Sequence, residues 1–217
     1  MDDDRLFFEQ QLNADEAARY ARFVRPQRRR QFLLGRMLLR LALSRMTNLS
    51  INAIGAIERP GKSPGLLLAG ARHTQPGFSL SHSRDWIACA VSAESAIGLD
   101  IEAIDSDRDF NGIAQTAFHA NEAAWLQRQA DNMRVAAFYH LWSLKEAWYK
   151  LMSNRGEERP LPDLTDPDSE LKSQGDGWFS CTLPHAALSV VICTDHPMPS
   201  IRVAEPVELT RDLWRLA

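Results

Sequence analysis

Apolar and polar residues near the N-terminus recur with the period of α-helices. Residues 15–24 and 27–46 both show this spacing, and Pro26 stands where a first helical turn tolerates proline. In the longer segment, arginines occupy a more polar side than the apolar residues, which are Phe32, Leu33, Met37, Leu41 and Leu43. We therefore expect two amphipathic helices in this region.

Strands are predicted next along the chain, up to residue 102. The apolar runs here are short, and glycine, proline and polar residues separate them, as they commonly separate strands. The last run alternates between apolar and polar residues, which is typical of a strand with one wet face. The expected strands are residues 51–57, 78–81, 86–92 and 96–102, with a further apolar run at 66–68.

After residue 103 the order of helices followed by strands starts again. The expected segments are helices at 113–130 and 132–152, a polar loop to residue 177, and strands at 179–183 and 187–194. In the first of these helical segments, Asn121-Glu122 stands either inside the helix or at a break. This repetition predicts an α+β fold of two lobes, residues 1–103 and residues 104–217.

Composition narrows the class of protein. The 217 residues are 45% hydrophobic and 24% charged, which excludes a disordered chain, and no apolar stretch is long enough to span a bilayer. No secretory signal is visible, and the three cysteines Cys89, Cys181 and Cys193 lie among apolar or small residues, as free thiols do. The sequence therefore predicts a cytoplasmic protein that does not act at a membrane.

Positive charge is concentrated in the first half of the chain, although the net charge is −3. Between Ala17 and Ile57 there are nine arginines and no acidic residue. Such a segment attracts phosphates, nucleic acid or an acidic protein, and a solvated helix face can have the same composition. The charge pattern alone leaves these alternatives open.

The segment Gly98-Leu99-Asp100-Ile101-Glu102 is the first candidate for chemistry. In a strand, Asp100 and Glu102 point to the same side, so their carboxylates repel each other. A hard cation such as Mg²⁺ relieves that repulsion through oxygen ligands. The alternative is an edge strand whose acidic face is simply solvated.

The second candidate is the helix that contains the segment 142–150. Its apolar residues lie almost all round, which is typical of a buried helix, yet Ser143, Glu146 and Lys150 form one narrow polar stripe. A surface ion pair between Glu146 and Lys150 is the simpler interpretation. Charge on a buried helix is costly unless it is paired or functional, so the stripe favours a functional site.

Two further segments carry groups suited to phosphate. Hydroxyl groups and a histidine follow one another in Ser79-Leu80-Ser81-His82-Ser83, and Lys62 stands in the turn Gly61-Lys62-Ser63-Pro64. Ordinary turn chemistry explains either segment equally well when it is taken alone.

Taken together and in this order, these segments resemble the Sfp-type 4′-phosphopantetheinyl transferases. That family is marked by a Gly-(Val/Ile/Leu)-Asp-(Ile/Val)-Glu strand and a Trp/Phe-(Ser/Thr/Cys)-x-Lys-Glu-(Ala/Ser)-x-x-Lys helix. The matching segments are Gly98 to Glu102 and Trp142 to Lys150, a little over forty residues apart. The arginine-rich helix with Gly35-Arg36, the Lys62 turn and Ser81-His82 fall in the family's order, and the resemblance covers roughly residues 20–195.

The resemblance implies a pseudo-dimer of two similar α+β lobes with the active site between them. It implies transfer of the 4′-phosphopantetheine arm of coenzyme A to a serine of an apo acyl or peptidyl carrier protein, with Mg²⁺ as cofactor and 3′,5′-ADP as the other product. Because one chain already holds both lobes, a monomer is expected, and nucleic acid is not expected as a partner.

Residue roles carry over by matching position. Asp100, Glu102 and Glu146 look like the Mg²⁺ ligands, and Glu122 matches an acid placed near the metal and the attacking hydroxyl. Either Glu122 or Glu146, directly or through a water, would take the serine proton as general base, with a slight preference for Glu122, because a metal-bound Glu146 would be the poorer base. The implied catalytic residues are Glu122, Glu146 and Lys150.

Coenzyme A would be held by a second set of residues. Lys145 and Lys150 look like contacts of the pyrophosphate, and Ser81 and His82 resemble the residues that hold the 3′-phosphate. Further contacts are implied for Lys62 and Arg36. An inserted serine after Lys62 distinguishes this chain from the usual Gly-Lys-Pro turn.

Two other functions remain open on the residues alone. The same acids would suit an Mg²⁺-dependent phosphodiesterase acting on coenzyme A or nucleotides without any acceptor protein. The arginine-rich helix would suit a nucleic-acid-binding module, although that interpretation leaves the acids on the strand and the helix without a role.

Overall fold

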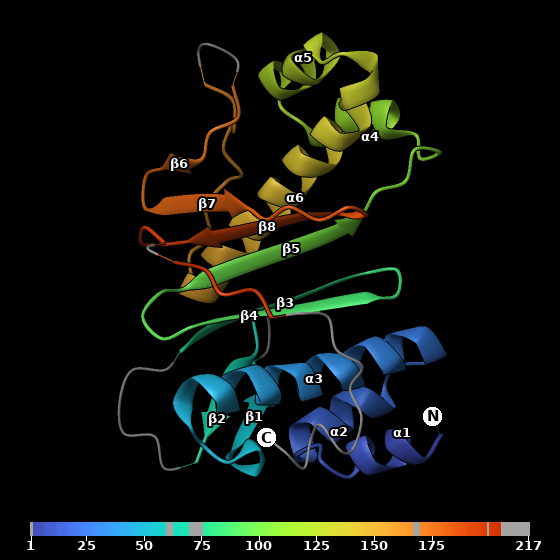
Figure 1. Cartoon of the computed structure of the whole chain (residues 1–217), viewed down its shortest axis with the longest axis vertical. Helices are drawn as coiled ribbons and strands as arrows, with labels where there is room; N and C mark the ends of the chain where they lie inside the picture. The colour runs from blue at the N-terminus through green and yellow to red at the C-terminus, as the bar shows by residue number, and fades with distance from the viewer. Residues whose placement is uncertain (1, 60–62, 70–75, 167–169, 199, 205–217) are drawn as a thin grey trace.

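The computed structural model describes residues 2–59, 63–69, 76–166, 170–198 and 200–204. Along the long axis of the molecule, the N-terminal helices lie at one end, two short helices of the second half lie at the other, and strands lie between them (Figure 1). The architecture is a mixed α+β fold with antiparallel sheets, as the sequence predicts.

Three helices pack together near the N-terminus: α1 (Asp2–Glu9), α2 (Ala14–Ala21) and α3 (Pro26–Thr47). The predicted helices 15–24 and 27–46 are confirmed as α2 and α3, whereas α1 was not predicted. A capping box between Asn13 and Glu16 begins α2, because each side chain accepts a hydrogen bond from the other's backbone N–H. The core that these helices share contains Phe8, Tyr20, Leu33, Met37 and Leu41.

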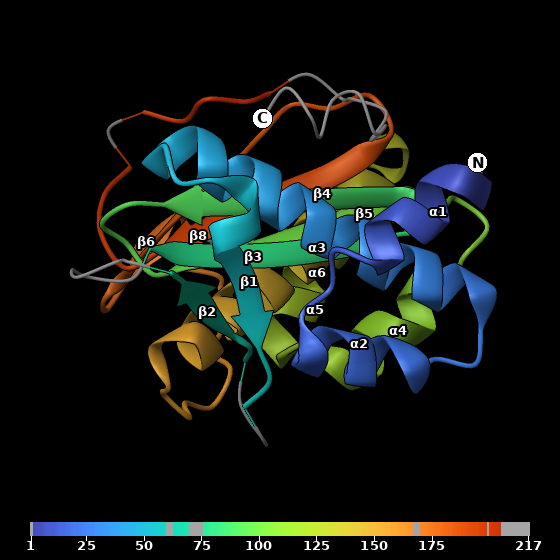
Figure 2. The same ribbon diagram turned by 90° about the horizontal axis from the view of Figure 1, so that it is seen from below.

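Two antiparallel hairpins follow the helices. Strands β1 (Ile54–Ile57) and β2 (Gly65–Leu68) form the first, and β3 (Gly77–Ser83) and β4 (Trp86–Ser92) form the second. The strand predicted at 51–57 is shorter than expected, because its first three residues form a 3-10 turn. Helix α3 packs against β4, so it covers the second hairpin (Figure 2).

The largest sheet combines strands from both halves of the chain. Its order is β5 (Ile97–Ala103), β8 (Leu188–Thr194), β7 (Trp178–Thr182) and β6 (Gln174–Gly175), and every neighbouring pair is antiparallel. The predicted strands 96–102, 179–183 and 187–194 are confirmed here. Since β5 pairs with β8, the last predicted strand of the first half joins the sheet of the second half.

A helical segment was expected over residues 113–130, with Asn121-Glu122 inside it or at a break, and the structure has two helices there. Helix α4 (Phe110–Ala117) ends at Phe118, and α5 (Ala120–Arg128) begins after His119, which caps it. Glu122 closes this cap by accepting the backbone N–H of His119 at 2.8 Å. The break therefore arises from a second capping box inside the helical pattern.

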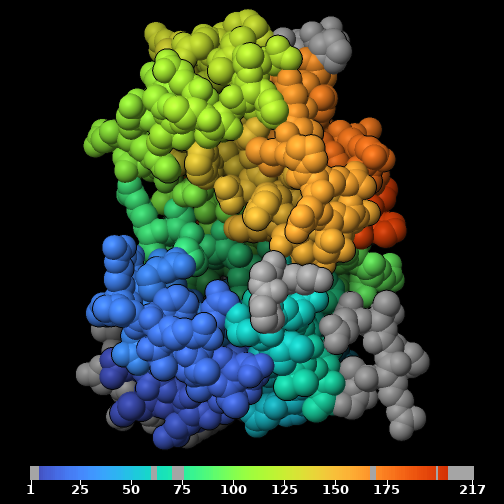
Figure 3. All heavy atoms as spheres, turned by 180° about the vertical axis from the view of Figure 1, so that it is seen from behind, coloured from blue at the N-terminus to red at the C-terminus, as the bar shows by residue number. Residues whose placement is uncertain are grey.

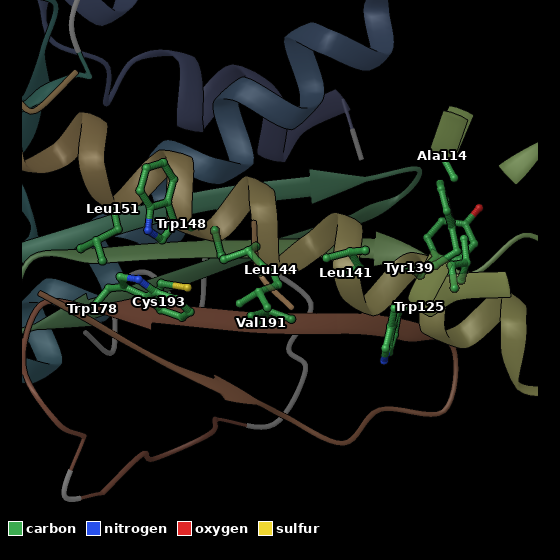
Figure 4. Close-up of a cluster of buried hydrophobic side chains, with 14 of the residues drawn as sticks. Ala114, Trp125, Tyr139, Leu141, Leu144, Trp148, Leu151, Trp178, Val191 and Cys193 are labelled. Carbon is green, nitrogen blue, oxygen red and sulfur yellow. The ribbon is translucent and has the colours of Figure 1, made fainter. Parts of the chain in front are cut away.

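Helix α6 (Asp131–Arg155) covers one face of the large sheet and carries the main core of the molecule. Leu144 and Trp148 of α6 lie among Val191 and Cys193 of β8 (Figure 4). A Cβ at Gly98 would collide with the carbonyl oxygen of Ala147, so glycine lets β5 approach the helix closely. The predicted helix 132–152 is confirmed, with one more residue at its start and three more at its end.

The two ends of the molecule meet at strands β3, β4 and β5. In the space-filling view, the blue and cyan atoms of the first helices and hairpin form one mass, and the yellow and orange atoms of the second half form another (Figure 3). Strand β3 lies beside β5 at this junction. No helix among the described residues is both long and apolar enough to cross a membrane.

Candidate active site

Three acidic side chains gather where β5 meets α6. Asp100 and Glu102 share one face of β5, and Asp100 is only 4% exposed, while Glu102 is half-buried. Glu146 lies on α6, and, besides burial, the charges of Asp100 and Glu102 both raise the pKa of its carboxyl group. The structure therefore brings together the three acids that the sequence predicts as metal ligands.

Lys150 binds this cluster from one turn further along α6. Its ammonium donates to Asp100 Oδ1 at 2.8 Å, to Ser81 Oγ at 3.0 Å and to the carbonyl of Leu99 at 3.0 Å. An ammonium has three hydrogens, so these three acceptors use all of them. Lys150 is thereby held rigidly across β5, rather than standing free for a ligand.

The single lysine does not neutralise the cluster. Burial, and then the charge of Asp100, raise the pKa of Glu146 above its usual value. Burial also raises the pKa of Glu102, with a smaller contribution from Asp100. Burial and neighbouring negative charge therefore disfavour the ionised forms of both Glu102 and Glu146. Such shifts are typical of an acidic cluster that lacks enough positive charge nearby.

The donor set fits a hard divalent cation. Asp100 Oδ2 is buried and has no hydrogen-bond partner among the described residues, so one carboxylate oxygen stands ready to accept a ligand. Carboxylate oxygens are the ligands that Mg²⁺ prefers. The three acids are nevertheless not pre-arranged as a closed set, since the described part of the chain contains no group of three His, Cys, Asp or Glu side chains positioned to hold a metal ion.

A cavity of about 290 Å³ opens beside this cluster, between α3, β3 and α6. Four of the predicted site residues line it: Arg36, Ser81, His82 and Lys150. Helix α3 and strand β3 come from the first half of the chain and α6 from the second, so both halves build the cavity. Lys62, also predicted at the site, lies outside the described residues.

His82 lies in β3, where the sequence predicted a turn, and it meets a second basic side chain. Its Nε2 is 2.5 Å from Nη1 of Arg28, which also lines the cavity. Burial, and then the charge of Arg28, lower the pKa of His82. Arg28 begins a run of three arginines, and only the tertiary structure shows which of the three faces β3.

Arg36 is held deep in the wall of the cavity. It is 4% exposed, and its guanidinium lies 3.3 Å from Glu58 and 3.7 Å from Glu16. The group also stacks over the ring of Phe32 at 4.7 Å, and burial lowers its pKa. The two acids that hold Arg36 were missed in the sequence, because they lie far from it along the chain.

Glu122 and Lys145, both predicted at the site, pair with each other. Glu122 is fully buried and accepts from Lys145 Nζ at 2.6 Å and from the backbone N–H groups of His119 and Leu164. Its oxygens are therefore occupied by donors that fix α5, α6 and the following loop. Lys145 is buried as well, and neither residue lines the cavity described above, so in this structure the two side chains engage each other and the fold.

Comparison with known proteins assigns the family. Residues 96–196 match the model of the 4′-phosphopantetheinyl transferase superfamily. The chain is 32% identical over 170 residues to the 4′-phosphopantetheinyl transferase AcpT of Salmonella typhi, a match that covers 78% of this chain and 79% of that protein. The chain belongs to the 4′-phosphopantetheinyl transferase family.

Two other relatives match a longer and a shorter part of the chain. The 4′-phosphopantetheinyl transferase Sfp of Bacillus subtilis is 27% identical over 211 residues, which are 92% of this chain and 88% of that protein. The 4′-phosphopantetheinyl transferase gsp of Aneurinibacillus migulanus is 30% identical over 150 residues, which are 66% of this chain but only 57% of that protein. In this last comparison the chain spans less than two thirds of its relative.

The region of the family model coincides with the large sheet, α4, α5 and α6. It contains Asp100, Glu102, Glu146 and Lys150, whereas Arg36 and His82 lie before it. In this member of the transferase family, the acidic cluster therefore comes from the part that the family model describes, and the basic wall of the cavity comes largely from the helices and hairpins that precede it.

Proposed function

We propose that the protein transfers the 4′-phosphopantetheine arm of coenzyme A to a serine hydroxyl of an apo carrier protein and releases 3′,5′-ADP. The observation that carries the proposal is the acidic cluster of Asp100, Glu102 and Glu146 beside a cavity lined with basic side chains. An acidic cluster suits a cation, and the basic wall suits the phosphates of a substrate that carries several of them. Membership of the transferase family supports the same conclusion.

Asp100, Glu102 and Glu146 would hold Mg²⁺, with the unpartnered Oδ2 of Asp100 as one ligand atom. The ion would supply positive charge to the pyrophosphate of coenzyme A and to the 3′,5′-ADP leaving group. The raised pKa of Glu102 and Glu146 supports this assignment, because a site built for a dication disfavours ionised acids when the dication is absent.

The basic residues would bind the remaining charge of coenzyme A. Arg28 and His82 meet at one side of the cavity and together suit the separate 3′-phosphate, and Arg36 offers a buried guanidinium beside them. Lys150 would act mainly by fixing Asp100, since its hydrogens are already engaged. Lys62 keeps its proposed role as a further phosphate contact.

Glu146 is the acid that we assign as general base. It is half-buried, so an incoming hydroxyl can reach it, and a carboxylate oxygen that does not bind the cation would remain to accept the proton. One of its oxygens would take the proton of the carrier serine while the serine oxygen attacks phosphorus. Glu122 is replaced in this role because its oxygens are occupied within the fold.

We also propose that residues 1–103 and 104–217 are the related halves of a pseudo-dimer with the active site between them. The repeated order of helices and strands supports this, as does a cavity whose walls come from α3 and β3 on one side and α6 on the other. A monomer is expected, because one chain supplies both sides. Sedimentation of the purified protein tests that expectation.

The direct test is a change of mass. The purified protein is incubated with coenzyme A, Mg²⁺ and a panel of apo acyl and peptidyl carrier proteins, and each carrier is weighed by mass spectrometry. We expect one carrier to gain the mass of a single phosphopantetheine arm, with no gain when EDTA replaces Mg²⁺. Release of 3′,5′-ADP without any gain on a carrier would instead indicate hydrolysis, and no reaction at all would refute the proposal.

A further inference from the structure

Serine side chains, rather than backbone groups, link strands β3 and β5 at the junction of the two halves. The backbone N–H groups of Leu99, Ile101 and Ala103 donate to the hydroxyl oxygens of Ser79, Ser81 and Ser83, at 2.9, 3.2 and 3.0 Å. Alternate residues of a strand share a face, so the three hydroxyls form one row that points at β5. We call these three residues the serine row.

Two members of the row have a second task. Ser81 donates its hydroxyl hydrogen to Asp100 Oδ1 at 2.9 Å, and Ser83 donates to Glu102 Oε2 at 2.8 Å. Ser79 makes no such bond to a carboxylate in the described structure. The row therefore contains two serines that hold acids of the cluster and one that only links the strands.

These bonds decide which carboxylate oxygens remain open. Oδ1 of Asp100 already accepts from Ser81 and Lys150, which leaves Oδ2 buried without a partner. In the same way the bond from Ser83 engages Oε2 of Glu102 and leaves Oε1. A carboxylate held by one oxygen cannot rotate freely, so the other oxygen keeps its direction.

We propose that Ser81 and Ser83 are positioning residues that orient Asp100 and Glu102 to bind the divalent cation through Oδ2 and Oε1. The inference rests on the proposed function, because it assumes that these acids hold a cation. It assigns to Ser83 a role that neither the motif nor the cavity lining indicates. It also gives Ser81 a task besides any contact with phosphate.

Ser83 is the better residue to test, because Ser81 also contacts Lys150 and lines the cavity. In Ser83→Ala, Glu102 loses the bond that orients it, whereas Ser83→Thr keeps a hydroxyl and suits a strand. Ser79→Ala is the matched control, since it removes a hydroxyl of the same row that touches no acid. The loss of the acceptor for the buried N–H of Leu99 should make Ser79→Ala the less stable of the two alanine variants.

The experiment measures binding of Mn²⁺ to the metal-free full chain by the electron paramagnetic resonance of the free ion. Unfolding temperature in EDTA is recorded for every variant. We expect Ser83→Ala to bind Mn²⁺ about 10-fold more weakly than wild type, as is typical when a group that orients a metal ligand is removed. Ser83→Thr should restore most of the affinity, and Ser79→Ala should stay within about 2-fold of wild type while its unfolding temperature falls.

The outcomes separate this inference from the proposed function. If wild type binds Mn²⁺ and Ser83→Ala binds it equally well, the positioning role is wrong while the metal site stands. Equal weakening by Ser79→Ala and Ser83→Ala would also overturn it, because the effect would then follow strand linkage alone. If wild type binds no Mn²⁺, the proposed metal site fails, and the positioning role fails with it.

Discussion

Helix α6 contributes two lysines that each meet a buried acid, and the two pairs differ in what they leave open. Lys145 meets Glu122, whose two oxygens are filled by the lysine and two backbone N–H groups. Lys150 meets Asp100, which keeps a buried oxygen without a partner beside a basic cavity. The residue types and the burial of the acids are alike, so neither property distinguishes the pair that we propose for function from the pair that we assign to the fold. We infer the distinction from Oδ2 of Asp100, which is buried and has no partner among the described residues.

We call Lys150 and Asp100 the open pair, because Asp100 keeps an oxygen without a partner, and Lys145 and Glu122 the closed pair. Removing the negative charge of Asp100 should have the largest effect on transfer. In Asp100→Asn the cluster loses an acid that we assign to the cation, and we expect transfer to the carrier to fall about 1,000-fold, because charge stabilisation at the reacting centre is lost. Mass spectrometry of the carrier measures transfer, and thermal unfolding checks that the fold persists. Near-normal transfer would remove the distinction between the two pairs.

Removing Glu122, the acid that pairs with Lys145, should instead destabilise the fold. Glu122→Ala leaves Lys145 buried without its partner and takes an acceptor from His119 and Leu164, so we expect a loss of about 3–5 kcal/mol in the free energy of unfolding. Urea denaturation measures this loss. The control is Glu122→Leu combined with Lys145→Met, which leaves no buried charge and should recover part of the stability. Unchanged stability together with lost transfer would return Glu122 to a catalytic role.

The variant His82→Ala tests whether the cavity beside Lys150 and Asp100 binds the 3′-phosphate of coenzyme A. This variant removes one of the two basic groups that meet there, and we expect the KM for coenzyme A to rise about 10-fold, which corresponds to about 1.4 kcal/mol. The KM for the form of coenzyme A that lacks the 3′-phosphate should change much less. Equal changes for both substrates would contradict the assignment of His82 to that phosphate.

The smallest expected effect is the change with pH in the stability of the metal-free protein. Because the folded-state pKa values of Glu102 and Glu146 are raised, the folded protein holds more protons than the unfolded chain from the usual glutamate pKa up to these raised values. Stability in EDTA should therefore decline as pH rises through the folded-state pKa values. Glu146→Gln should reduce this decline and stabilise the metal-free protein at neutral pH by less than about 1 kcal/mol.

Thermal unfolding across pH, with and without Mg²⁺, measures this last prediction. We expect added Mg²⁺ to stabilise wild type more than Glu146→Gln, since binding to the folded state raises its stability. If the stability of both proteins in EDTA declines equally as pH rises, Glu146 does not contribute to the repulsion among Asp100, Glu102 and Glu146.

Much of the fold was predictable because its signals are local. The helices α2, α3 and α6 and the strands β4, β5 and β8 follow from the spacing of their apolar residues, within a few residues at the ends. The helical segment predicted over 113–130 is interrupted at Phe118 and His119, just before the Asn121-Glu122 pair at which a break was considered. Helix α1 was missed because eight residues carry little periodic signal.

The acidic cluster was also predictable, but the partners of its members were not. Alternation along β5 puts Asp100 and Glu102 on one side, and helical spacing puts Glu146 and Lys150 on one stripe. The same spacing could not show that Lys145 turns to Glu122, nor that Ser83 reaches Glu102. The sequence signal for the serine row, three serines at every second residue of β3, is visible only once β3 is known to lie beside β5.

By itself, the sequence determined the elements, the family and the set of acids and bases available for chemistry, because these depend on residue type and on spacing within one segment. Only the tertiary structure decided which acids keep an open oxygen, which of three consecutive arginines faces the cavity and which lysine pairs with a fully engaged acid. Those properties depend on contacts between segments that are far apart in the chain. Burial makes the contacts decisive, since an acid away from water must find either a partner in the fold or a ligand.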